Sequence, residues 1–234
     1  MNNDKPAYRK FDHNEHAKSR DPDDFWGQIR RTVNGEPVSD EQIMLIIDSI
    51  RAALGLQHDD SLLDLACGNG ALSHLLFNSI AEYQGVDFSE YLIKVARANF
   101  ERVPSHRFMT MGAAEYVRQE ARPERFTKML CYGSFSYFSA ADAQEVLGTL
   151  FTRFSNVRSV FIGNLPDKDR APAFYKDKLV SAEEMLDNES QIGIWRSQSE
   201  FAELAGSAGW KTVFSVMPAE YYAGYYRYDA LLTR

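Results

Sequence analysis

Two aspartates and a glycine-rich turn are the residues whose types and spacing point most directly to chemistry. Asp64 lies in the apolar run LLDL, and the turn ACGNG, residues 66–70, follows it. Glycine in such a turn permits positive φ and lets a ligand approach the backbone closely. The apolar run predicts a strand and ALSHLLFNSI a helix, an order that brings backbone amides and a helix N-terminus up to a ligand. The stretch therefore predicts a ligand-binding site.

The second aspartate, Asp87, ends the short run YQGVD and precedes a helix that Ser89 is expected to cap. It follows Gly70 at close to the roughly 20 positions expected for an acid that binds a ribose diol. A carboxylate suits this role because it can accept hydrogen bonds from both ribose hydroxyls at once. We therefore predict that Asp87 binds a ribose, the alternative being a solvated aspartate at a strand end.

The turn itself fits one nucleotide-binding family better than another. A dinucleotide-binding fingerprint would have a third small residue, glycine, where Ser73 stands. The stretch from Asp64 to Gly70 instead closely resembles the first motif of class I S-adenosylmethionine-dependent methyltransferases, with Ala66 in place of the first glycine. The resemblance spans about residues 40–234, and it implies transfer of the cofactor's methyl group to a nucleophile by in-line displacement.

The resemblance also implies which residues bind the cofactor. Asp64 would face its methionine end, the backbone of residues 66–70 would wrap it, and the loop at Gly112 would meet its adenine. Arg30 and Arg31 could bind the cofactor's carboxylate if the N-terminal segment closes as a lid, the alternative being solvated surface charge. The cofactor-binding residues expected on this basis are Asp64, Ala66, Cys67, Gly68, Asn69, Gly70, Asp87, Phe88, Gly112, Ala113, Ala114, Tyr132 and Arg31.

The methyl acceptor should lie beyond the carboxyl ends of the later strands. Candidate acceptor contacts are Ser134, Asn164, Tyr221, Tyr222 and Tyr225. For the tyrosines the alternative is an ordinary position in strands and loops, which aromatic residues favour anyway.

A hydroxyl acceptor requires a general base, whereas an amine or thiolate needs none. The candidate catalytic residues are His13, His16 and Tyr132. No carboxylate follows the fourth predicted strand, where metal-dependent members of the family place acidic ligands, so we expect no metal.

These residues require an α/β scaffold to bring them together. The alternation of apolar runs and helical segments, with the resemblance, predicts a Rossmann-like, doubly wound, mostly parallel seven-stranded sheet. Its last strand should be antiparallel, and helices should cover both faces. Capping boxes at Ser39–Gln42 and Ser197–Glu200 mark two helix starts. The spacing of Phe25, Ile29 and Val33 predicts a short N-terminal helix that ends near Asn34-Gly35.

The same patterns divide the chain into two parts. Residues 1–38 form an N-terminal extension, expected either as a helical lid over the cofactor or as a helix packed on the domain. Residues 39–234 form the methyltransferase domain, and the long connection at about 166–196 is expected to be a substrate cap.

Composition narrows the function classes. The formal net charge of the 234-residue chain is −7, which argues against a nucleic-acid substrate. Two cysteines and a polar N-terminus predict a cytoplasmic protein, and no apolar run approaches the length of a membrane span. The leading hypothesis is methylation of an oxygen or nitrogen of a small molecule, such as a sugar or secondary metabolite. The alternatives are an RNA or protein methyltransferase, or a non-catalytic nucleotide- or NAD-binding protein.

Overall fold

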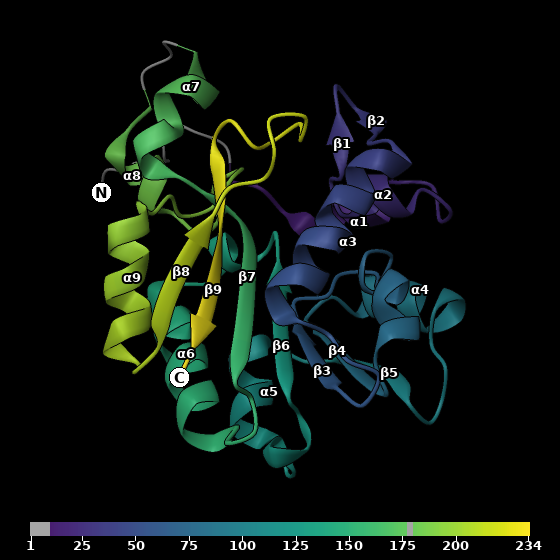
Figure 1. Cartoon of the computed structure of the whole chain (residues 1–234). Coiled ribbons are helices and arrows are strands. Elements are labelled where there is room, and N and C mark those ends of the chain that lie inside the picture. Colours follow the sequence, from purple (N-terminus) through teal and green to yellow (C-terminus); the bar gives the residue numbers. More distant parts are fainter. Residues whose placement is uncertain (1–9, 177–179) are drawn as a thin grey trace, which may run out of the picture.

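The computed structural model describes residues 10–176 and 180–234, and within them the main sheet has seven strands (Figure 1). Their order is β5-β4-β3-β6-β7-β9-β8, and β9 runs antiparallel to both of its neighbours. The strands are β3 (Ser61–Leu65), β4 (Glu82–Asp87), β5 (His106–Thr110), β6 (Lys128–Tyr132), β7 (Ser159–Pro166), β8 (Lys211–Ser215) and β9 (Arg227–Thr233). The predicted sheet, including its antiparallel last strand, is confirmed.

Helices cover both faces of this sheet because each central strand is apolar on both sides. Leu62 packs in one core cluster with α3, whereas Leu63 and Leu65 pack in the other with α5, α6 and α9. The long helices are α3 (Asp40–Leu54), α4 (Glu90–Asn99), α5 (Ala113–Gln119), α6 (Ala140–Arg153) and α9 (Gln198–Ser207). Short 3-10 helices are η1 (Ser73–Ser79), η2 (Pro123–Arg125), η3 (Phe135–Tyr137) and η4 (Lys168–Arg170).

The chain order reverses between β3 and β6. From β3 the chain proceeds outward through β4 to β5, and it then returns to place β6 on the other side of β3. The two loops that leave β3 and β6 therefore diverge and open a crevice, the usual ligand position in a doubly wound sheet. The loop after β3 is the glycine-rich turn.

Two local predictions about helices differ from the structure. The segment after the turn is the tighter 3-10 helix η1 rather than an α-helix. Ser39 precedes α3 but makes no capping hydrogen bond, so the predicted Ser39–Gln42 capping box is wrong. The Gln42 amide instead binds a distant loop, with Nε2 donating to Glu220 O and Oε1 accepting from Tyr222 N, both at 2.9 Å. The second box, at Ser197 and Glu200, is confirmed.

The predicted helix from Phe25 to Val33 is also wrong. Only one turn forms, α2 (Phe25–Gln28), after which the chain makes the hairpin β1 (Thr32–Val33) and β2 (Glu36–Pro37). Asn34 and Gly35 have φ of 53° and 89°, the geometry that Asn-Gly adopts in two-residue hairpin turns. This local turn preference overrides the apolar spacing. A further short helix, α1 (His13–Lys18), precedes α2 in the chain. Residues 1–9 of the predicted extension lie outside the described residues.

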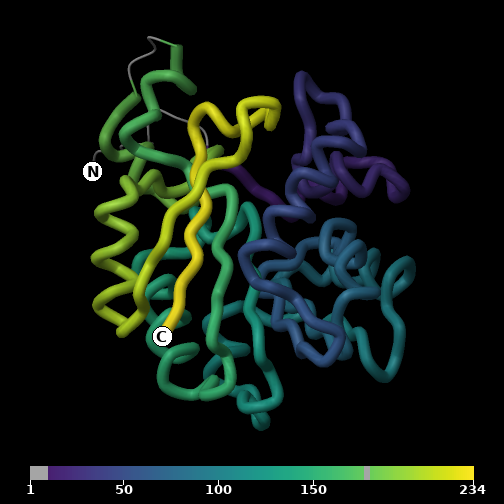
Figure 2. The backbone as a smooth tube through the Cα atoms, viewed as in Figure 1, coloured from purple at the N-terminus to yellow at the C-terminus, as the bar shows by residue number. Residues whose placement is uncertain are grey.

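The connection after β7 contains α7 (Ala171–Tyr175) and α8 (Ala182–Leu186), so its helical pieces are present. Residues 177–179 of the predicted cap lie outside the described residues. Figures 1 and 2 place this connection, the β8–β9 loop and the N-terminal hairpin at the same end of the molecule. In the described ranges, the helices are all too short or too polar to cross a bilayer.

Candidate functional site

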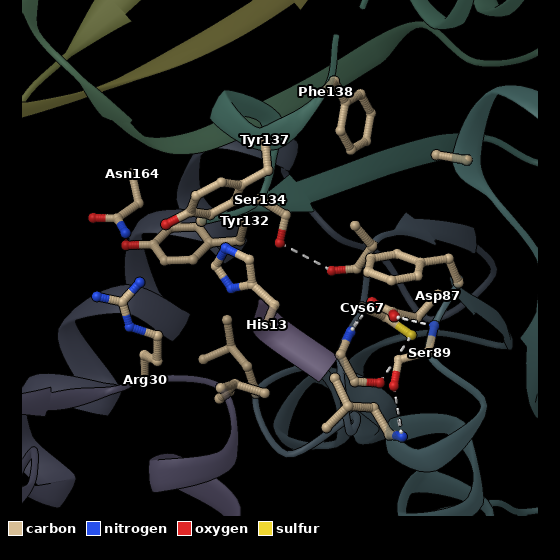
Figure 3. A pocket seen from close by; sticks show the side chains of 18 of the residues that line it. His13, Arg30, Cys67, Asp87, Ser89, Tyr132, Ser134, Tyr137, Phe138 and Asn164 are labelled. Atoms are coloured by element: carbon tan, nitrogen blue, oxygen red, sulfur yellow. Dashed lines mark hydrogen bonds between the residues drawn. The ribbon is translucent and has the colours of Figure 1, made fainter. Parts of the chain in front are cut away.

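A cavity of about 670 Å³ lies at the carboxyl ends of β3, β4, β6 and β7 (Figure 3). This volume falls within the range of roughly 300–1,000 Å³ that small-molecule sites occupy. Most of the predicted site residues line it together. They are His13, Arg31, Asp64, Ala66, Cys67, Gly68, Asp87, Phe88, Gly112, Ala113, Ala114, Tyr132, Ser134, Asn164 and Tyr222.

The structure places five predicted residues outside the cavity lining. Gly70 packs against the core, where an added Cβ would lie 2.7 Å from the Phe108 ring. Tyr221 is 2% exposed, and its hydroxyl lies 3.4 Å from the Tyr132 hydroxyl, behind the wall. Tyr225 is 51% exposed.

The other two excluded residues hold the N-terminal segment in place. The His16 ring Nε2 lies 3.0 Å from Gly27 O. The fully buried Asn69 amide donates to Phe25 O at 2.8 Å and to Gln28 Oε1 at 3.0 Å. Sequence reasoning placed Asn69 at the ligand because it lies in the turn, but its side chain points the other way, into α2.

The glycine-rich turn and Asp87 form one unit. Ala66 and Gly68 have φ of 57° and 61°, the left-handed region that favours glycine, which explains why glycine commonly stands at the Ala66 position. The Gly68 amide donates to Asp87 Oδ2 at 2.9 Å, and the Ser89 amide donates to Oδ1 at 2.9 Å. Each carboxylate oxygen keeps a further lone pair for a ligand in the cavity.

Asp64 is 2% exposed and lies beneath the turn. Its Oδ2 accepts hydrogen bonds from Ser73 Oγ and, at 2.9 Å, from the Tyr83 hydroxyl. Burial raises the pKa of Asp64 to about 7, although both hydrogen bonds lower it and the neighbouring Asp87 raises it further. Burial also raises the pKa of Asp87, against the two amide hydrogen bonds. Two buried carboxyl groups at adjacent strand ends favour a ligand with positive charge.

The segment 10–38 crosses the cavity and binds both of its sides. Ser89 Oγ donates to Asn14 Oδ1 at 2.7 Å on the β4 side. On the opposite side, Phe11 N donates to Glu189 O and Arg30 Nη1 to Gln191 O, each at 2.8 Å. Together with the contacts of Asn69, these bonds hold the segment between the glycine turn and the connection after β7.

His13 contributes its ring to the cavity wall from this segment (Figure 3). The ring packs edge-on against Tyr137 at 4.1 Å and Phe11 at 4.7 Å between ring centroids. Its Nε2 is buried and has no hydrogen-bond partner among the described residues. Burial, with a smaller effect of Arg30, lowers the pKa of His13 to about 4, so the ring is neutral at neutral pH.

The end of the cavity away from Asp87 is aromatic and cationic. Arg31 is 7% exposed, and its guanidinium lies 4.7 Å from the centre of the Tyr132 ring. Several residues in this region were not predicted, because their approach depends on how the connection and the β8–β9 loop fold. They are Gln28, Tyr137, Phe174, Tyr226 and Arg227, whereas Arg30 was expected, with Arg31, at the cofactor's carboxylate. Their only sequence signal is a high local density of aromatic residues beside arginine, as in YYRY at 225–228.

Within the two described ranges, no three His, Cys, Asp or Glu side chains are grouped so that they could hold a metal ion.

Comparisons with known proteins identify the central part of the chain. Residues 62–154 match a family model described as a methyltransferase domain. No curated protein sequence matches the chain.

Solved structures show the same fold at low sequence identity. The magnesium protoporphyrin IX methyltransferase from Synechocystis PCC 6803, solved with bound SAH, has 16% identity and a TM-score of 0.57, covering 83% of this chain and 82% of that one. The cyclopropane synthase MmaA2 from Mycobacterium tuberculosis has 12% identity and a TM-score of 0.59, covering 84% and 95%. The small RNA methyltransferase HEN1 has 18% identity and a TM-score of 0.62, covering 85% of this chain and 26% of that one.

Proposed function

We propose that this chain is a class I S-adenosylmethionine-dependent methyltransferase that methylates an oxygen or nitrogen of a small molecule. The match of residues 62–154 to a methyltransferase domain and the fold shared with solved methyltransferases support the proposal. The observation that carries the proposal is one cavity that joins the glycine turn and Asp87 to an aromatic end under the N-terminal segment. A sugar or a secondary metabolite fits such an enclosed site.

The residues present fit S-adenosylmethionine. Gly68 lines the cavity with no side chain of its own between its backbone and a ligand, and Asp87 has lone pairs free for ribose hydroxyls. Ala113 and Ala114 begin α5 at the cavity wall, where their backbone would meet adenine, beside the exposed Phe88 ring. Arg31 would bind the carboxylate. When bound, the cofactor supplies an activated methyl group on a sulfonium.

The chain's own residues then position the acceptor and exclude water. Alignment of two reactants can supply roughly 7–11 kcal/mol of barrier reduction, more than a general base usually adds. The segment 10–38 acts as a lid in this proposal, because its contacts with the glycine turn and with Gln191 close the cavity over both ligands.

A hydroxyl acceptor also needs a group that takes its proton, and His13 is the candidate because its ring lines the cavity and is neutral at neutral pH. Its pKa of about 4 makes it a weak base, and its buried Nε2 would have to turn toward the acceptor. His16 is occupied by Gly27 O, and burial raises the pKa of Tyr132 well above its ordinary value, so neither competes well as a base. An amine acceptor would require no base.

Two other function classes make different predictions. An RNA or protein methyltransferase would need an accessible site with a complementary surface, whereas the N-terminal segment spans this cavity and the net charge is −7. A nicotinamide-binding protein would bind NAD in preference to S-adenosylhomocysteine.

The small-molecule enzyme would act in the cytoplasm, where its two unpaired cysteines stay reduced.

Isothermal titration calorimetry with S-adenosylhomocysteine and NAD in parallel tests the proposal. We expect S-adenosylhomocysteine to bind and NAD to bind at least tenfold more weakly. Preferential binding of NAD would refute the assignment of the cofactor.

A further inference from the structure

Two carboxyl groups and three guanidinium groups lie at opposite ends of the cavity, which Glu115 and Arg118 of α5 and Asp142 of α6 also line. The carboxyl groups of Asp64 and Asp87 lie at the tips of β3 and β4. At the other end lie the guanidinium groups of Arg30 and Arg31, from the N-terminal segment, and of Arg227, from the start of β9. Figure 3 shows this separation, with Arg30 beside Asn164 at one end and Asp87 and Ser89 at the other.

None of these three arginines forms an ion pair with a carboxylate within the described part of the chain. The Nε atoms of Arg31 and Arg227 are buried and have no hydrogen-bond partner there. Burying a guanidinium with no carboxylate to balance its charge costs free energy, so the retention of these groups at a cavity wall points to an anionic ligand.

Arg31 and Arg227 both approach Asn164. Burial raises the pKa of Tyr137, and the charge of each of the three arginines lowers it by a smaller effect. Arg227 Nη1 donates to Asn164 O, and its guanidinium lies 4.6 Å from the centre of the Tyr226 ring. Arg31 Nη2 and Asn164 Nδ2 both approach Gly133, where an added Cβ would lie 3.0 Å and 3.4 Å from them. Asn164 has φ of 63°, in the left-handed region that few residues other than glycine adopt. The backbone N–H of Asn164 donates a hydrogen bond to Asp229 Oδ1, which holds it in this conformation.

Asp229 is the buried carboxyl group that partly balances this charge. Burial raises its pKa to about 6, against the effects of the Asn164 hydrogen bond, Arg227 and Arg31. It lies behind Asn164 and does not line the cavity, and one carboxylate does not neutralise three guanidinium groups. A net positive charge therefore faces the cavity at the acceptor end.

We propose that the methyl acceptor is a small anion whose carboxylate or phosphate is bound by Arg227 together with Arg30. Arg31, beside the loops after β3 and β6, is left for the carboxylate of the cofactor. The inference rests on the proposed function and adds the chemical class of its acceptor. The Arg227 guanidinium lines the cavity, and its Nη donors suit an oxygen of a carboxylate or phosphate, while the Tyr226 ring covers its planar face.

The test uses full-length protein saturated with S-adenosylhomocysteine and probes matched in shape. Ligand-observed NMR compares 4-hydroxybenzoate with its neutral methyl ester, and inorganic phosphate is tested by ³¹P line width. We expect the acid to bind about tenfold or more tightly than the ester, the advantage of a charge-assisted hydrogen bond. Tighter binding of phosphate than of 4-hydroxybenzoate would identify the phosphate form of the acceptor, and the reverse order the carboxylate form.

Three variants make the test specific. Arg227→Met should remove the preference for the acid, Arg227→Lys should retain part of it, and the exposed Arg122→Met, which removes the same charge outside the cavity, should retain all of it. Equal binding of acid and ester by the unaltered protein, or an unchanged preference in Arg227→Met, would overturn the inference. Failure of S-adenosylhomocysteine to bind would instead contradict the proposed function, so the two failures are distinguishable.

Discussion

At the scale of single residues, the site is defined by two buried carboxyl groups with different hydrogen-bond partners. Asp87 accepts two backbone amides and faces the cavity, whereas Asp64 accepts from the Ser73 and Tyr83 hydroxyls beneath the turn. The first arrangement suits a group that binds a ligand directly. The second fixes the base of the turn and places a titratable charge close to the ligand.

Asp87→Ala should weaken binding of S-adenosylhomocysteine by roughly 1–3 kcal/mol, the cost of removing a charged acceptor of the ribose hydroxyls. Calorimetry measures the change, and the exposed Asp59→Ala, which lies outside the cavity, is the control for net charge. Equal affinities in Asp87→Ala and in the unaltered protein would mean that Asp87 does not bind the ribose.

Asp64→Asn should stabilise the apo protein more at pH 8 than at pH 5. Because its folded pKa is raised to about 7, the stability that its protonated form contributes is full below the unfolded value of 3.8 and is lost as pH rises through 7. An amide cannot ionise and avoids this loss. Thermal unfolding of both proteins at the two pH values checks the sign, and a benefit confined to pH 5 would contradict the raised pKa.

At the scale of elements, the glycine turn joins three parts of the fold: β3, the core beneath β5, and the N-terminal segment. Gly70 contacts Phe108 in the core, and Asn69 binds the backbone and side chain of α2. The contribution of Gly70 and of Asn69 can each be tested by a substitution, with a control substitution elsewhere in the chain.

Gly70→Ala should destabilise the protein, because its φ of 75° disfavours a side chain and the new Cβ would lie 2.7 Å from Phe108. The matched control is Gly148→Ala in α6, where nothing lies within 4 Å and alanine should be neutral or stabilising by about 0.5–1 kcal/mol. Denaturant unfolding gives both values. A Gly70→Ala protein as stable as Gly148→Ala would show that the turn relaxes freely.

Asn69→Ala should loosen the N-terminal segment while the sheet stays intact, since two hydrogen bonds to α2 are lost, at a cost of about 1–3 kcal/mol. Hydrogen exchange should accelerate in residues 25–38 and remain slow in β3 and β6. Asn99→Ala, which removes an exposed bond within α4, is the control. Unchanged exchange in residues 25–38 would mean that other contacts hold the segment.

The sequence predicted the elements whose signals are local and strong. The strand–turn–helix motif, the acid at Asp87 and the Ser197–Glu200 capping box all lie within short stretches that fix their own geometry. The hairpin at Asn34-Gly35 was also readable, because the turn preference of Asn-Gly is stronger evidence than three apolar residues at helical spacing. The contacts of Gln42 could not be predicted in this way. Its side chain forms hydrogen bonds with residues about 180 positions later in the chain, and the local sequence pattern holds no information about such distant partners.

At the scale of the whole molecule, segments that are far apart in the sequence meet at the site. The segment 10–38 reaches the connection after β7 through Arg30 and Gln191, and Arg227 arrives from the start of the last strand. Such long-range approaches explain why the lining of the cavity beside the glycine turn could be predicted from local motifs, whereas the presence of Arg227 at its other end could not. The acidic net charge also concealed this local positive charge, because total composition averages over the surface and the cavity.

The most direct test of the central claim is a crystal structure of the protein with S-adenosylhomocysteine. We expect the ribose hydroxyls on the Asp87 carboxylate, the adenine beside Ala113 and Ala114, and the amino-acid carboxylate within reach of Arg31. Density for the ligand elsewhere, or an Asp87 side chain turned out of the cavity, would contradict it.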